Sequence, residues 1–138
     1  VAPSRGLGDV YKRQLMDRAN RFALDVTDAC LVEGLSDKGY MMYEKKGGRT
    51  TGHASWWGQI ETMIACVNAW QISGNDVYLQ SADTVWTFVK DCMIDREYGE
   101  WYSDCFDGEP KKDTPKVSMW RCPYHTVRLG VEIHNRLK

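Results

Sequence analysis

The chain has 138 residues, the size of one ordinary domain, and 43% of them are hydrophobic, which is enough for a core and excludes a disordered protein. Its 18 basic and 19 acidic residues are mixed along the chain and give a formal net charge of -1, so neither nucleic acid nor an anionic membrane is an expected partner. No apolar run approaches the roughly 20 residues that a membrane-spanning helix needs.

Residues 1–14 differ from the rest of the chain. They show neither a helical nor a strand period, lack the apolar centre of a secretory signal, and include "GLGDVYKRQ", which resembles translated linker sequence. We therefore expect residues 1–14 to be non-native or linker-derived and residues 15–138 to form the domain. From Leu15 to Gly34, apolar residues recur at steps of three and four, which predicts an amphipathic helix. A short extended piece comes next in "SDKGYMMYEKKGG", and then a loop that reaches His53.

Three further helices are predicted after this loop. "WWGQIETMIACVNAWQISG" forms a helix that stops at Gly74 and buries one apolar side: Trp57, Ile60, Ile64, Val67 and Ala69. "NDVYLQSADTVWTFVKDCMID" forms a helix capped by Asn75 or Asp76, with an apolar stripe: Tyr78, Leu79, Ala82, Val85, Trp86 and Val89. A second extended piece, "EYGEWYSDCFDGEP", precedes a last helix from about Tyr124 to the end.

The pattern of a helix, a glycine-bearing strap and another helix occurs twice, with Gly39 and Gly99 in corresponding places. Such units predict an all-α fold, an α/α toroid in which outer and inner helices alternate and hairpin-like straps line a pocket at one end. Two units cannot close a ring. The chain is therefore either a small helical bundle or part of a larger toroid.

The cysteines favour a reducing compartment. They are five in number, form no C-x-x-C pair, and two of them fall inside helical patterns, which points to free thiols and a cytoplasmic protein. Cys122 and His125 have the spacing of half a zinc site. No second pair of ligands with such spacing exists in the sequence, so no metal is expected.

Two motifs carry chemistry. In "HASWWGQIE", Trp57 and Glu61 are four residues apart and share a helix face, an arrangement that can stack a sugar ring and accept its hydroxyl hydrogen bonds. The same spacing also fits a core tryptophan beside a solvated glutamate. In "MWRCPYHTVR", His125 falls in the first turn of a helix, where the positive end of the helix dipole favours the neutral imidazole that a general base requires. Arg128 lies on the same face. A hydrogen-bonded structural histidine fits this spacing equally well.

"WWGQIE", "YLQSADTVWTFVKDCMIDREYGEWYSDCFDGEP" and "WRCPYHTVRLGVEI" resemble the C-terminal part of the cellobiose 2-epimerase family, which belongs with the N-acylglucosamine 2-epimerases. The resemblance covers roughly residues 15–138 and implies part of an (α/α)6 barrel that needs no cofactor. It implies that one histidine removes the C2 proton of a ring-opened reducing-end glucose. A second histidine then reprotonates the cis-enediolate on the opposite face, which gives mannose.

The resemblance also implies roles for residues. His125 matches one of the two catalytic histidines, Trp57 and Trp120 match sugar-stacking residues, Glu61 matches a polar ligand of the substrate, and Arg128 matches the motif around the site. The "GHDIE"-like helix start that carries the second histidine has no counterpart here. The chain alone is therefore expected to be inactive, as a fragment of an enzyme whose substrate is a disaccharide or monosaccharide.

Other functions remain open. One is an N-acylglucosamine 2-epimerase-like enzyme. Another is a glycoside hydrolase or lyase with Glu61 as the acid, which requires a second carboxylate facing it. A third is a non-catalytic carbohydrate-binding or interaction module that keeps Trp57 and Trp120 but transfers no proton. The sequence does not define the oligomeric state.

Overall fold

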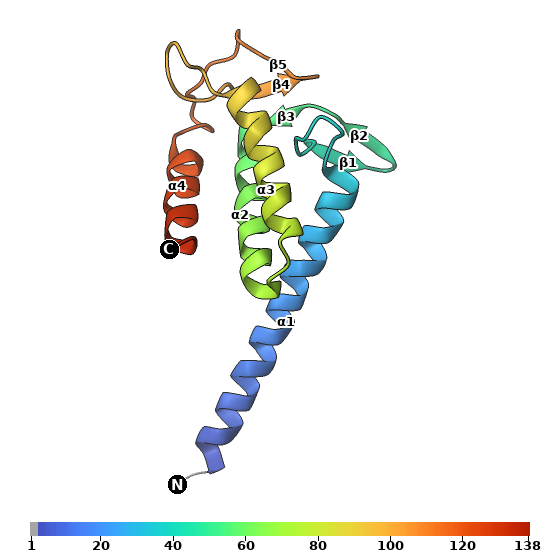
Figure 1. The fold of residues 1–138 in the computed structure, drawn as a ribbon, viewed down its shortest axis with the longest axis vertical. Helices are drawn as coiled ribbons and strands as arrows, with labels where there is room; N and C mark the ends of the chain where they lie inside the picture. Colours follow the sequence, from blue (N-terminus) through green and yellow to red (C-terminus); the bar gives the residue numbers. More distant parts are fainter. Residues whose placement is uncertain (1–2) are drawn as a thin grey trace.

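The computed structural model describes residues 3–138, and its architecture is a row of four helices with short strands at one end (Figure 1). The elements in chain order are α1 (Pro3–Gly34), β1 (Glu44–Lys46), β2 (Arg49–Thr51), β3 (Ala54–Ser55), α2 (Trp56–Ser73), α3 (Val77–Phe88), the π-helical turn η1 (Val89–Met93), β4 (Asp104–Phe106), β5 (Glu109–Pro110) and α4 (Tyr124–Arg136). The helices α2 and α4 run in one direction, and α1 and α3 run in the other. No helix among the described residues is long and apolar enough to cross a membrane.

Helix α1 begins earlier than the sequence predicted. It extends through residues 3–14, a segment in which the sequence shows no helical period, while residues 1 and 2 lie outside the described range. Side chains 8–14 are all exposed, which explains why no apolar period marks this part. Extending an existing helix avoids the cost of nucleation and needs no packing partner. The linker origin of residues 1–14 stays a prediction.

The core lies around α2, which packs against α1, α3 and α4. Ile60 of α2, Val85 of α3 and Met93 of η1 are fully buried in the main cluster. A second cluster joins Cys66 and Ala69 of α2 to Tyr78 of α3, whose hydroxyl donates to Asp28 of α1 at 2.7 Å. The sequence-based apolar faces of α2 and α3 are thus largely confirmed, with two exceptions. Trp57 and Trp86 are 37% and 36% exposed, because they lie at the edges of these faces.

The ends of the helices show the expected chemistry. Gly74 ends α2 in the left-handed conformation with φ of 70°, and the side chain of Asn75 accepts from the first amide of α3 at 3.1 Å. The first strap follows α1, the second strap follows η1, and both begin in the same way. Leu35 forms an isolated antiparallel bridge with Met41 in the first strap, and Ile94 forms one with Trp101 in the second. Each bridge encloses a turn that contains a glycine with positive φ. The internal repeat inferred from Gly39 and Gly99 is therefore present in the structure.

The strands form two small sheets that tie the straps together. β1 and β2 form a hairpin, and β3, β4 and β5 form an antiparallel sheet in which Ala54 pairs with Cys105. Because β3 comes directly before α2, this sheet joins the second strap to the start of α2. Both α2 and α4 begin at the end of the molecule where the strands lie, which we call the strap end (Figure 1).

Candidate active site

A cluster of one carboxylate, one imidazole and one guanidinium group connects α2 to α4 near the strap end. Oε1 of Glu61 lies 3.0 Å from Nδ1 of His125, and Nη1 of Arg128 donates to both oxygens of Glu61 at 2.6 Å. His125 and Arg128 are three residues apart and therefore share a face of α4. The structure thus joins three of the residues singled out in the sequence, across 64 residues of chain for Glu61 and His125.

The contact with Glu61 defines the chemistry available to His125. An ionised carboxylate only accepts hydrogen bonds, so a neutral imidazole in this position carries its proton on Nδ1 and keeps a free lone pair on Nε2. The His125 side chain is 17% exposed and the Glu61 side chain 35%, so the ring is largely withdrawn from solvent while its partner stays accessible. The hydrogen bond to Glu61 and the charge of its carboxylate raise the pKa of Arg128.

Two aromatic rings contact the imidazole. The ring of Tyr124 is 3.9 Å from that of His125 between centroids, and the ring of Trp56 meets it in a T-shaped arrangement at 6.3 Å. Pro123 occupies the cap position of α4, so His125 lies in the first turn as predicted. These contacts restrict the ring's rotation about its own side-chain bonds.

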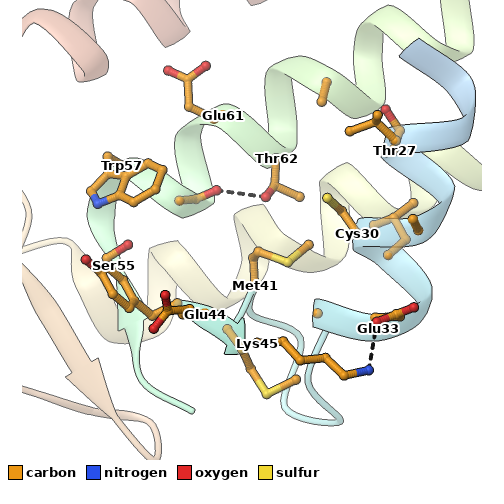
Figure 2. A pocket seen from close by; sticks show the side chains of 18 residues that line it. Thr27, Cys30, Glu33, Met41, Glu44, Lys45, Ser55, Trp57, Glu61 and Thr62 are labelled. Carbon is orange, nitrogen blue, oxygen red and sulfur yellow. Dashed lines mark hydrogen bonds and ion pairs between the residues drawn. The ribbon is translucent and has the colours of Figure 1, made fainter. Parts of the chain in front are cut away.

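Trp57 lies one turn before Glu61, beside a cavity of about 520 Å³ between α1, α2 and the first strap. Trp57 and Glu61 line one side of this cavity, and Thr27 and Cys30 of α1 line the other (Figure 2). Tyr43 meets the indole of Trp57 edge-on at 6.1 Å. The exposed indole and the carboxylate lie on one helix face, as their spacing predicted, while the apolar residues of α1 give the cavity a mainly hydrophobic wall.

Trp120 lies on the loop before α4, and its side chain is 86% exposed. Its amide donates to the hydroxyl of Ser118 at 3.3 Å. The stacking role that the resemblance implies for Trp120 stays a prediction. Among residues 3–138, no group of three or more His, Cys, Asp and Glu side chains gathers in the manner of a metal site. All five cysteines have free thiols.

The charged loop "FDGEPKKDTPK" is anchored to Asp95, a residue that sequence reasoning missed. Lys116 forms an ion pair with Asp95, whose side chain is only 5% exposed, and donates to the carbonyl of Gly99 at 2.9 Å. The hydrogen bond from Lys116, with those from the amides of Tyr98 and Glu97, holds the pKa of Asp95 far below its usual range. The aspartate is the last residue of the helix predicted over residues 75–95, where nothing in the sequence distinguishes it from a solvated residue.

The fold and the site define part of an α/α barrel with a histidine, a carboxylate and an arginine at the start of two parallel helices. The chain belongs to the N-acylglucosamine 2-epimerase (GlcNAc 2-epimerase) family, whose model matches residues 9–128. It is 34% identical to cellobiose 2-epimerase from Ruminococcus albus over 133 residues, which is 94% of this chain and 33% of that protein. It is 37% identical to the Bacteroides fragilis cellobiose 2-epimerase over 110 residues, 76% of this chain and 28% of that protein.

A solved structure of a sugar epimerase has a similar fold. A crystal structure of a sugar epimerase from a ruminal bacterium matches 92% of this chain and 33% of its own, with a TM-score of 0.85 and 31% identity. The all-α fold, as part of an (α/α)6 barrel, and the resemblance to cellobiose 2-epimerases are thereby confirmed. The chain spans about a third of the length of the curated relatives it matches.

Proposed function

We propose that this chain supplies part of the active site of a sugar 2-epimerase. The enzyme converts the reducing-end glucose of cellobiose and related β-1,4-linked disaccharides to mannose, without a cofactor. The family membership supports the reaction type, and the names of the relatives support the substrate class. We further propose that residues 15–138 form the C-terminal portion of the barrel, which agrees with the third of the relatives' length that they cover.

The reaction exchanges one proton at C2. In the open-chain sugar, this carbon is next to the aldehyde, so loss of its proton gives an enediolate whose negative charge is shared with O1. Return of a proton to the opposite face inverts the carbon. Two groups are needed, and each must act as a base in one direction and as an acid in the other, a role for which histidine is suited near neutral pH.

The observation that carries the proposal is the contact between His125 and Glu61. With the Nδ1 proton directed to the carboxylate, Nε2 is the atom that takes or returns the C2 proton. When Nε2 becomes protonated, the imidazolium is stabilised by the carboxylate 3.0 Å away. Arg128 holds the same carboxylate in place.

Glu61 and the tryptophans contribute binding. Each carboxylate oxygen has two lone pairs, so Glu61 retains capacity to accept a sugar hydroxyl while it contacts His125 and Arg128. The exposed indole of Trp57 offers a face on which a sugar ring stacks, one turn away on α2. Trp120 is proposed to provide a second stacking face. The opposing histidine is proposed to come from a segment outside residues 15–138, so that the chain by itself is inactive.

The cluster argues against the hydrolase alternative. A glycosidase requires one carboxylic acid that protonates the leaving oxygen and a second carboxylate across the scissile bond. Both oxygens of Glu61 already accept from Arg128, and one of them also contacts His125. This arrangement suits a carboxylate that orients an imidazole better than an acid that gives up a proton.

A segment exchange tests the proposal. Residues 15–138 replace the aligned segment of the Ruminococcus albus cellobiose 2-epimerase, and the chimera is assayed for conversion of cellobiose to its mannose-ended epimer. We expect activity that is abolished by His125→Ala and retained by His134→Ala, a matched change of an exposed histidine on the same helix. Full activity of the His125→Ala chimera would instead favour a non-catalytic role for this chain.

A further inference from the structure

Arg121 is a buried cation at the junction between the second strap and α4. It precedes His125 by four residues, and its side chain is 4% exposed. The carboxylate of Glu100 is 4.0 Å from Nη2, at the limit of an ion pair. Burial lowers the pKa of Arg121. Removing a charge from water without a close counter-ion is costly, so the position is a poor choice for stability alone.

Its guanidinium is committed to the second strap. Nη1 donates to the hydroxyl of Ser103 at 2.7 Å, and Nη2 donates to the carbonyl of Trp101. Nε is buried and has no hydrogen-bond partner among residues 3–138. The backbone of Arg121 is also fixed, since it exchanges hydrogen bonds with Ser118 in both directions, at 2.9 and 3.1 Å. Hydrogen bonds therefore fix both the guanidinium group and the backbone of Arg121.

The same guanidinium reaches the start of α2. Its Cζ lies over the indole of Trp56, 4.9 Å from the ring centroid, and the amide of Trp56 donates to the carbonyl of Ser103 at 2.9 Å. The ring of Trp56 in turn meets the ring of His125 in a T-shaped arrangement. Arg121 thus connects the strap, the first residue of α2 and the segment that leads into α4, which are the elements that determine the distance between Glu61 and His125.

We propose that Arg121 is a positioning residue that keeps the imidazole of His125 in register with Glu61 through Trp56 and the start of α4. Its catalytic consequence rests on the proposed epimerase function, whereas its effect on the state of the His125 ring does not. A lysine is a poor replacement, because its single nitrogen cannot stand at the separate positions from which Nη1 and Nη2 bond Ser103 and Trp101.

The test measures directly which ring nitrogen of His125 carries the proton. Long-range proton–nitrogen NMR spectra of the 138-residue chain are compared for wild type, Arg121→Lys and Arg121→Met, with Arg96→Met as the control because Arg96 is exposed and donates to the carbonyl of Lys90. His53 and His134 serve as internal references. In wild type we expect the proton on Nδ1. In both Arg121 variants we expect the separation of the two ring nitrogen shifts to shrink toward that of free histidine.

The outcomes are decisive. Wild-type shifts for His125 in either folded Arg121 variant, with far-UV circular dichroism unchanged, would overturn the proposal. If Arg121→Met does not fold, the Lys variant and Ser103→Ala, which removes one partner of the guanidinium, decide the question. In the chimera we expect Arg121→Lys to lower kcat by about 10- to 100-fold with little change in KM. An inactive wild-type chimera would count against the epimerase function only, since the NMR result stands without it.

Discussion

Gln59 provides the sharpest test of how the straps are attached to α2. Its side chain is fully buried and makes three hydrogen bonds to the backbone of the first strap and its junction with α2. Oε1 accepts from the amide of Met41 at 2.8 Å, and Nε2 donates to the carbonyls of Met41 at 2.8 Å and Ser55 at 3.0 Å. The change to examine is Gln59→Ala.

The expected cost is set by these contacts. Each hydrogen bond contributes about 1 kcal/mol net, and the truncation removes the side-chain partner of both the amide and the carbonyl of Met41 in a partly buried region. The void left by the amide adds about 1 kcal/mol. We therefore expect Gln59→Ala to lower the free energy of unfolding by about 3 to 4 kcal/mol.

Urea denaturation followed by tryptophan fluorescence and far-UV circular dichroism measures this change. Gln80→Ala, at an exposed position of α3, is the matched control and should change the free energy of unfolding by less than about 0.5 kcal/mol. A loss below about 1 kcal/mol for Gln59→Ala would mean that the strap is not held by this side chain. Gln59→Glu keeps the acceptor for Met41 but turns a carboxylate toward two carbonyls, so it should destabilise at least as strongly.

Two further predictions concern titratable groups. Because the folded-state pKa of Asp95 is depressed, its ionised form stabilises the fold above the unfolded-state pKa, and this contribution is lost as the pH falls through the folded value. The urea midpoint of Asp95→Asn should therefore be lower than that of wild type at neutral pH, and the difference between the two midpoints should narrow from about pH 5 downward. A difference that does not change with pH would contradict this. Burial raises the pKa of Cys66 to about 11 and that of Cys105 to about 12, so an alkylating reagent should label the exposed Cys30 and Cys122 at neutral pH and reach Cys66 and Cys105 only on unfolding. Equal labelling rates in the native protein, measured by mass spectrometry of peptides, would count against the packing of α2 and β4.

The helices could be predicted because local signals define them. Gly74 marks the end of α2, Pro123 precedes α4, and the apolar period of residues 15–34 places the second part of α1. The first part of α1 escaped because an exposed helix carries no apolar period. Trp57 was assigned to the buried side because a tryptophan beside Ile60 extends an apolar face, and spacing does not show where that face ends.

The site could be predicted only in part. Spacing along one helix places His125 beside Arg128, and the resemblance placed Glu61 in the same site. Their contact joins residues 64 positions apart, which no local pattern contains. Gln59 and Arg121 were missed for a different reason. Polar residues are usually exposed, so a buried amide or guanidinium is recognised only when the backbone groups that satisfy it are brought together by the fold.

The central claim is that His125 transfers the C2 proton of a sugar. The most direct measurement is deuterium uptake at C2 when the chimera carrying residues 15–138 turns over cellobiose in D2O, followed by NMR of the product. We expect a mannose-ended product labelled at C2, with both the label and the product lost in His125→Ala and kept in His134→Ala. Epimer formed without deuterium at C2, or labelled at the wild-type rate by the His125→Ala chimera, would contradict the claim.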